Sequence, residues 1–400
     1  MKVDPQQLMD DGYIVLREVV PPELLAELRA SYDTLIERQG GQTWLAGGRQ
    51  PRLTTNHTVD AATANTIDFW LHENTLGVSR QLMRGPEAAV TEMWVMCSPT
   101  RDHGPAEWHR DFDSPNMAPL QGLQTDLLEN GPAYVQWNIP LYDDNVLWLV
   151  PGSFRRPNTE EEDRQLRADP RKPLPGGIPV ELKAGDGVVY INLNHHWGSN
   201  YGTKLRRTIH GGYRSIGGPL YPYNPQSCNW DLDRGMGFCR HLSPAARRTF
   251  EGWAERLAQE RDLVEATLRT VLDRDAAAFR ARLAELHPGA KGRIVCVILL
   301  SKLAKNIHTL HRPDVAGQPL EARARAIPAN VPMCCFYDDL ARRFSSTEAG
   351  ALWQRFVELD DRLQADTMQE VPGRPERRSR YLYYAMPANL DVEEFIASWG

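Results

Sequence analysis

The sequence has few cysteines, and their spacing defines neither a disulfide framework nor a metal site. The 400 residues include six cysteines, at positions 97, 228, 239, 296, 334 and 335, and none of them forms a CxxC pair. Such spacing argues against a disulfide-stabilised fold and against a cysteine-rich zinc site. We therefore expect reduced thiols in a cytoplasmic protein.

Long apolar segments and an excess of positive charge are also missing. The longest apolar run covers residues 294–300, whereas a membrane-spanning helix needs roughly 20 residues. The first residues carry no apolar stretch of the signal-peptide type. Lys and Arg number 46 against 52 Asp and Glu, which gives a net charge of −6. These features predict no membrane partner and no nucleic acid bound through bulk positive charge.

The first half of the chain is rich in short strand-like runs separated by turn residues. The runs lie at residues 12–16, 93–96, 133–141, 147–150, 188–191 and 207–213. Short strands between turns favour a sandwich or barrel over a parallel sheet with crossover helices. An early helix is expected to open with Pro21-Pro22-Glu23 and to stop at Gly40 and Gly41. The charged, Pro- and Gly-rich segment 159–177 is expected to be a solvent-exposed loop.

After about residue 240 the apolar residues follow a helical period. Ser243 followed by Pro244 predicts a helix start, and Phe250, Trp253 and Leu257 continue at helical spacing. The fold class predicted is therefore α+β. The chain is expected to divide into a β-rich domain at 1–235 and a mostly helical region of unknown role at 236–400.

One motif in the β-rich part carries metal-binding chemistry. The sequence Trp-His-Arg-Asp at 108–111 places His109 and Asp111 two residues apart, so in an extended strand both side chains point the same way. Some 85 residues on, a β-rich run ends in His195 and His196. Two histidines and a carboxylate are the donor set of non-haem Fe(II) sites, which keep coordination positions open. Read as one regular strand, 188–196 turns His196 to the polar face and leaves His195 to packing.

These motifs resemble the phytanoyl-CoA dioxygenase family of Fe(II)/2-oxoglutarate-dependent oxygenases. The resemblance covers roughly residues 10–215, and its motifs lie at 12–16, 108–111, 136–139, 150–153, 196–198 and 206–208. It implies a double-stranded β-helix, that is, a jelly-roll or cupin-like core flanked by helices. The helical part after residue 240 lies outside the resemblance.

The resemblance also implies a role for each site residue. The iron ligands would be His109, Asp111 and His196. Arg207, eleven residues after the second histidine, would bind the distal carboxylate of 2-oxoglutarate, and Arg206 is interpreted as a surface charge. Gln136 and Asn138 share one strand face, which in similar proteins lines the co-substrate site.

The activity implied is hydroxylation of an unactivated C–H bond of a small molecule, with Fe(II), 2-oxoglutarate and O2 consumed to give succinate and CO2. Related halogenases lack the carboxylate ligand, so the presence of Asp111 argues against halogenation, whereas desaturation and cyclisation remain open. An alternative is a jelly-roll metal- or ligand-binding protein without oxygenase activity. A further one is a hydrolase or isomerase using another divalent metal. A homodimer through the helical region is also expected.

Overall fold

The computed structural model describes residues 1–45, 52–98, 104–111, 118–199, 205–222, 228–232, 235–327, 331–370, 381–383 and 385–399. The strands are β1 (Tyr13–Leu16), β2 (Arg52–Thr54), β3 (Glu87–Cys97), β4 (Tyr134–Pro140), β5 (Leu147–Leu149), β6 (Ile178–Pro179), β7 (Gly187–Tyr190), β8 (His196–Gly198), β9 (Arg207–Ile216), β10 (Met368–Glu370) and β11 (Tyr381–Tyr383). No helix in these ranges is long and apolar enough to cross a membrane.

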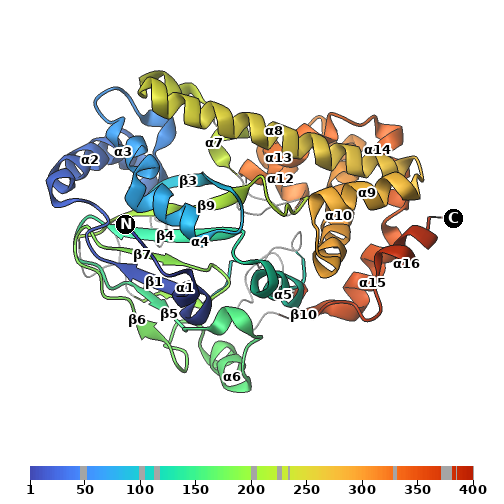
Figure 1. Ribbon diagram of the computed structural model, residues 1–400, viewed down its shortest axis with the longest axis horizontal. Helices are drawn as coiled ribbons and strands as arrows, with labels where there is room; N and C mark the ends of the chain where they lie inside the picture. Colours follow the sequence, from blue (N-terminus) through green and yellow to red (C-terminus); the bar gives the residue numbers. More distant parts are fainter. Residues whose placement is uncertain are drawn as a thin grey trace.

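The strands form a larger and a smaller antiparallel sheet. The larger has six strands in the order β1-β7-β4-β9-β3-β2, and the smaller has three in the order β6-β5-β8. Strands far apart in the sequence are neighbours, as in the pairing of β4 with both β7 and β9. An apolar cluster joins the two sheets. It includes Leu149 of β5, Tyr190 of β7, and Val180, which follows β6. This arrangement is the expected jelly roll, and its strands occupy one half of the molecule (Figure 1).

Helices cover the outer face of the larger sheet. Those before residue 200 are α1 (Pro5–Asp11), α2 (Pro22–Leu45), α3 (Asn65–Asp68), α4 (Val78–Leu82) and α5 (Leu120–Asn130). Helix α6 (Glu160–Ala168) packs instead beside the smaller sheet, where Leu166 joins a cluster with Trp197 of β8. Residues at alternate positions of the central strands, such as Val95 and Ile209, pack in one cluster with Leu28 and Leu35 of α2. Because strand side chains alternate between faces, the intervening residues point towards the smaller sheet.

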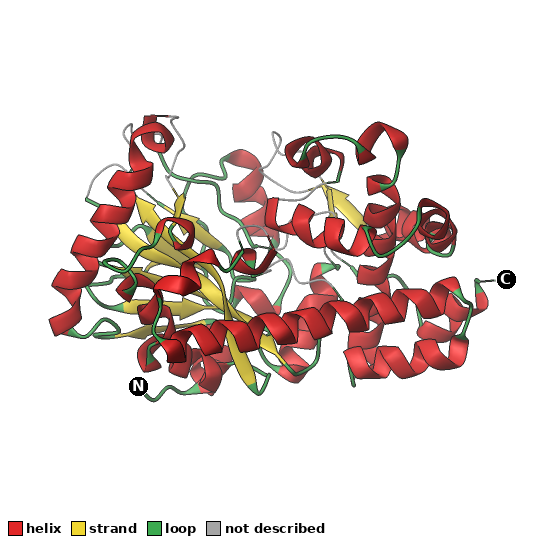
Figure 2. Cartoon of the chain, turned by 90° about the horizontal axis from the view of Figure 1, so that it is seen from above, coloured by secondary structure: helices red, strands yellow, loops and turns green. Residues whose placement is uncertain are grey.

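The second half of the chain is helical, as its apolar spacing predicts. Its helices are α7 (Asn229–Leu232), α8 (Pro244–Leu272), α9 (Ala276–Leu286), α10 (Ala290–Leu310), α11 (Pro313–Ala316), α12 (Leu320–Ala326), α13 (Val331–Ala341), α14 (Ser346–Gln354), α15 (Val357–Thr367) and α16 (Val392–Ala397). Figure 2 shows the strands gathered in one half and these helices, with the short β10–β11 pair, in the other. Helix α8 belongs to both halves, since Phe250 packs in the core of the sheet and Leu268 in the helical core.

Two local expectations were wrong. The segment 159–177 is not all loop, because α6 forms there. Thr159 accepts a hydrogen bond from the backbone of Glu162, whose side chain accepts one in return, and this capping box starts the helix. The early helix also continues through Gly40 and Gly41 to Leu45. A glycine inside a helix costs only about 1 kcal/mol relative to alanine, so glycine alone does not end one.

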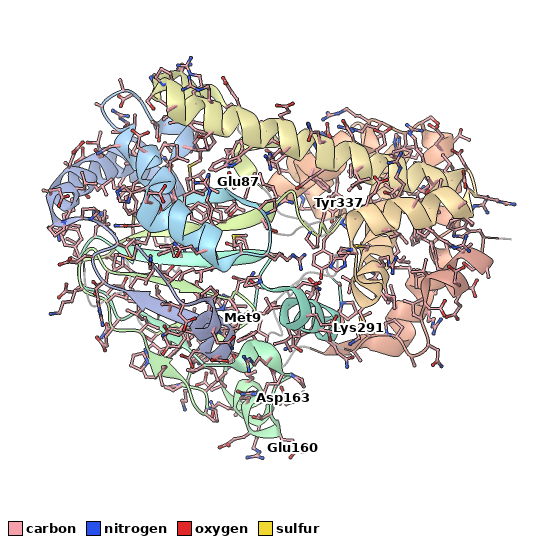
Figure 3. All side chains as sticks on the ribbon, in the orientation of Figure 1. Met9, Glu87, Glu160, Asp163, Lys291 and Tyr337 are labelled. Atoms are coloured by element: carbon pink, nitrogen blue, oxygen red, sulfur yellow. The ribbon has the colours of Figure 1, made fainter. Side chains whose placement is uncertain are left out.

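A buried charged cluster joins α5 to the helical region. Asp126 of α5 pairs with Arg84, and its other oxygen lies 2.8 Å from Nε2 of the fully buried His287. The ring of Tyr221 stacks on His287 and lies beneath the Arg84 guanidinium. Burial opposes the charge of Asp126, but His287 and Arg84 outweigh it and lower its pKa to about 2. Lys291, labelled in Figure 3, adds an exposed contact from α10 to α5.

This cluster predicts a pH-dependent contribution to stability. Asp126→Asn should lower the free energy of unfolding by about 2 kcal/mol at pH 7. The folded pKa of about 2 lies below the ordinary value of 3.8, so the contribution is present above about pH 4 and is lost as the pH falls towards 2. Urea unfolding at several pH values measures the difference. Glu129→Gln, which breaks only the exposed pair with Lys291, is the matched control and should change stability by less than about 1 kcal/mol. An equal loss in the two variants would contradict this account.

Candidate metal centre

Three side chains from distant parts of the sequence meet at one point between the sheets. One ligand atom each of His109, Asp111 and His196 lies within 4.8 Å of the other two. The Asp111 oxygens are 3.7 Å from Nε2 of His109 and 3.4 Å from Nε2 of His196. The Asp111 side chain is 29% exposed and that of His196 is 6% exposed, so the group is buried but open on one side.

Backbone hydrogen bonds orient both imidazoles. Nδ1 of His109 lies 2.8 Å from the carbonyl oxygen of Glu107, and Nδ1 of His196 lies 2.9 Å from that of Asn194. A carbonyl only accepts, so Nδ1 carries a proton in both rings, and Nε2 is the nitrogen that is left to bind a metal. Both Nε2 atoms face the Asp111 carboxylate. This arrangement of ligand and supporting hydrogen bond is common to histidines that bind metals, and the donor set fits Fe(II).

The smaller sheet brings the two histidines together. His109 forms an isolated antiparallel bridge with His196 at the start of β8, and each backbone N–H donates to the other's carbonyl. The backbone N–H of Asp111 donates to the carbonyl of Asn192 at 3.0 Å. On the opposite side, the rings of Trp108 and Trp197 stack at 5.3 Å. These contacts hold the His-x-Asp segment against the end of β8.

Arg110, between the two predicted ligands in the sequence, organises the surrounding loops. Its buried guanidinium donates to the carbonyls of Ser153 and Leu193 at 2.7 and 2.6 Å and to Oδ1 of Asn158 at 3.1 Å. The same Asn158 oxygen lies 2.6 Å from Nε2 of His195. The residue types alone gave no sign of this positioning role, because its partners are mostly backbone carbonyls of distant loops.

The choice of His196 over His195 agrees with the geometry, although the reason offered for it was wrong. Residues 188–196 do not form one regular strand: β7 ends at Tyr190 and β8 begins at His196, with a turn between. His195 turns away from the cluster towards Asn158. Burial, followed by the charge of Arg110, holds the pKa of His195 well below its usual value.

Gln136 and Asn138 lie on the inner face of β4, as their alternation predicts. Nε2 of Gln136 donates to the hydroxyl of Tyr190 at 2.7 Å, and Oδ1 of Asn138 lies 2.5 Å from Nδ1 of His210. The ring of Tyr190 in turn contacts His196 edge-on at 5.6 Å. The inner face of the larger sheet therefore reaches the three-residue cluster through Tyr190.

The two adjacent arginines are placed the other way round from the expectation. Arg207, at the start of β9, turns to the outer face, where its Nε donates to Asp33 of α2 at 2.9 Å. Arg206 is buried on the inner side. Its Nε donates to Asp144 at 2.7 Å, and Thr208 donates to the same carboxylate oxygen at 2.7 Å. Counting eleven residues from His196 selected the wrong face, because the strand's alternation places Arg206 with Thr208.

The charges around Asp111 favour its ionised form. Burial opposes ionisation, but His196 and the positive charge of Arg52 outweigh it, and the pKa of Asp111 lies below its usual value. An ionised carboxylate beside two imidazoles that both turn Nε2 towards it supplies the donor set for a divalent cation. His103 and Asp113, which flank the Trp-His-Arg-Asp motif and could also supply metal ligands, lie outside the described residues.

A jelly roll that holds a His-x-Asp pair and a distant histidine at one point has the architecture of the Fe(II)/2-oxoglutarate-dependent oxygenases. The profile of the phytanoyl-CoA dioxygenase (PhyH) family matches residues 8–208, slightly more than half of the chain. The chain belongs to this family. Enzymes of this class use Fe(II), 2-oxoglutarate and O2.

Several solved structures share part of the chain path at low sequence identity. AviO1 from Streptomyces viridochromogenes Tue57 is 22% identical over 55% of this chain and 98% of its own, with a TM-score of 0.40. HygX from Streptomyces hygroscopicus, solved with nickel and 2-oxoglutarate, is 15% identical over 54% of this chain and 89% of its own, with a TM-score of 0.41. EctD from S. alaskensis is 15% identical over 53% of this chain and 75% of its own, with a TM-score of 0.40. No curated protein matches the sequence.

Proposed function

We propose that this protein hydroxylates an unactivated C–H bond of a small organic molecule, coupled to conversion of 2-oxoglutarate into succinate and CO2. The observation that carries the proposal is the meeting of His109, Asp111 and His196, with both Nε2 atoms turned towards one carboxylate. Fe(II) bound there would supply the oxidising chemistry with O2. The chain itself would hold the reactants in register and exclude water.

The three predicted ligands would have different tasks. His109 and His196 would offer Nε2 lone pairs, and their Nδ1 protons, held by the carbonyls of Glu107 and Asn194, keep both rings from turning. Asp111 would add the negative charge that a divalent cation needs. The donor set uses three positions on the metal and leaves others open for the co-substrate.

Arg206, in place of Arg207, is the residue that we assign to the distal carboxylate of 2-oxoglutarate. Its burial and inward orientation support this assignment, and Asp144 fixes the guanidinium by accepting from Nε. A planar guanidinium held in this way can bind a carboxylate through two parallel hydrogen bonds. Arg207 would instead tie the sheet to α2 through Asp33. Gln136 and Asn138 stay candidates for the wall of the co-substrate site.

The test of the proposed function is turnover of 2-oxoglutarate. The purified protein with Fe(II), ascorbate and O2 should form succinate from 2-oxoglutarate even without substrate, at a slow uncoupled rate. Omission of Fe(II), or addition of a chelator, should abolish it. A folded, iron-loaded protein that forms no succinate under these conditions would instead support the jelly-roll binding protein without oxygenase activity.

We also propose a domain boundary, an oligomeric state and a cellular location, as expected from the sequence. The boundary near residue 235 would separate the oxygenase domain from the helical region, the helical region would form a homodimer, and the protein would be cytoplasmic. The thiols at 97, 228, 239, 296 and 334 are buried and not in disulfides, which supports the last of these. Light scattering coupled to gel filtration would decide the oligomeric state, since a dimer has twice the 45.3 kDa mass of the chain.

A further inference from the structure

An acidic side chain lies inside the jelly roll beside the metal centre. Glu92 is in β3, where the pairing with β9 shifts register between Val90 and Met93. This bulge directs the Glu92 side chain to the inner face, which Trp94 also occupies. Within the described ranges of the chain, the Glu92 carboxylate has no hydrogen-bond or ion-pair partner, although its side chain is largely buried.

The groups around Glu92 form one wall facing the metal centre. Trp94 stacks on His210 at 6.0 Å, and the guanidinium of the exposed Arg52 lies 5.6 Å from the Trp94 ring. Nε1 of Trp94 is buried and has no partner among the residues that the structure describes. The charges of Arg52 and Asp111 both act on Glu92, so Glu92 shares this inner face with the region of the metal centre.

Such a carboxylate is costly to keep unless a ligand pairs with it. Burial raises the pKa of Glu92 to about 8, with Arg52 opposing the shift and Asp111 adding to it. A buried ionisable group without a partner destabilises the fold by several kcal/mol or loses its charge. Fe(II) would not compensate it, because its two positive charges are outnumbered by the carboxylates of Asp111 and of bound 2-oxoglutarate. The interior therefore favours a cation and disfavours an anion.

We propose that Glu92 determines substrate specificity by binding an ammonium group, so that the substrate of this oxygenase is a small organic amine. The inference rests on the proposed function, since it concerns what is held beside the metal. An ammonium would give Glu92 a charge-assisted hydrogen bond in a site of low dielectric. The face of Trp94 would add a cation–π contact or cover the apolar part of the substrate. The exposed Arg52, whose guanidinium lies over the Trp94 ring, would bind an acidic group of the same molecule if it has one.

The test uses three probes of similar size and different charge: 1-pentylammonium, 1-pentanol and pentanoate. Saturation-transfer NMR measures their binding to protein loaded with Zn(II) and 2-oxoglutarate, and again without either. We expect the signal of the ammonium to exceed those of the other two at least fivefold in the wild type. It should fall to the level of 1-pentanol in Glu92→Gln. Because this change removes a carboxyl group that burial disfavours, the variant should melt no lower than the wild type.

Glu87→Gln is the matched control. It makes the same substitution at the far end of β3, where Glu87 (labelled in Figure 3) pairs with Arg80, and it should leave the ammonium signal unchanged. Equal binding of the ammonium and the alcohol, or an ammonium signal that survives Glu92→Gln, would overturn the inference. Succinate formation without any probe tests the proposed function separately. Its absence, with the ammonium preference intact, would refute the oxygenase and leave the amine site standing.

Discussion

Asp111→Ala should abolish the conversion of 2-oxoglutarate to succinate, with a fall of more than about 100-fold. Changes to residues that merely support a metal ligand cost 10- to 100-fold, so removal of a ligand should cost more. Asp111 is the one anionic member of the cluster, and the two imidazoles without it bind a divalent cation weakly. The measurement is succinate formed per minute at saturating Fe(II) and 2-oxoglutarate, beside metal content after dialysis.

Glu107→Gln is the control for this variant. Glu107 lies two residues before His109, and its carboxylate pairs with Arg171 at the surface at 2.8 Å. The substitution removes a nearby negative charge but keeps the backbone carbonyl that orients His109, so activity should stay within about threefold, as expected for a surface pair. If Asp111→Ala retained both iron and turnover, Asp111 would not be a ligand.

The two adjacent arginines should differ in their effect on the choice of 2-oxo acid. Wild type should prefer 2-oxoglutarate strongly over 2-oxopentanoate, which lacks the distal carboxylate. In Arg206→Gln we expect the ratio of kcat/KM for the two acids to fall at least about 30-fold, since hydrogen bonds between charged groups contribute 1.5–3 kcal/mol each. Arg207→Gln should keep the wild-type ratio and lose only its contact with Asp33.

The ratio separates co-substrate binding from loss of stability. Arg206→Gln leaves Asp144 without its buried charge partner, and the resulting destabilisation lowers turnover of both 2-oxo acids alike. Only a residue that binds the distal carboxylate changes the ratio. If the ratio of kcat/KM for the two acids fell in Arg207→Gln and not in Arg206→Gln, Arg207 would be the residue that binds the distal carboxylate, as counting from His196 predicted.

The fold and the three clustered residues could be predicted from the sequence because they depend on local patterns. Alternating apolar residues specify β4 and β9, and His-x-Asp places two ligands on one side of an extended segment. The family resemblance then related this segment to His196, 85 positions after Asp111. Where the prediction failed, the cause was a local irregularity: β7 ends before His195, so alternation does not continue to it.

The remaining site residues depend on contacts that no local pattern encodes. Arg206 and Arg207 are chemically equal, and only the register of β9 against β3 decides which faces inward. Arg110 acts on backbone carbonyls of loops some 40 and 80 residues away. Glu92 faces the interior because of a bulge, and a bulge leaves little trace in a single sequence. The capping box of α6, by contrast, was readable as Thr-x-x-Glu at 159–162.

The most direct test of the account is an anaerobic titration of the metal-free protein with Fe(II) and 2-oxoglutarate, followed through the weak charge-transfer band in the visible. The account predicts a saturable band in the wild type that needs both additions. The band should be lost in Asp111→Ala, weakened in Arg206→Gln and retained in Arg207→Gln. Folded wild-type protein that gives no band would contradict the central claim that His109, Asp111 and His196 form an Fe(II)/2-oxoglutarate site.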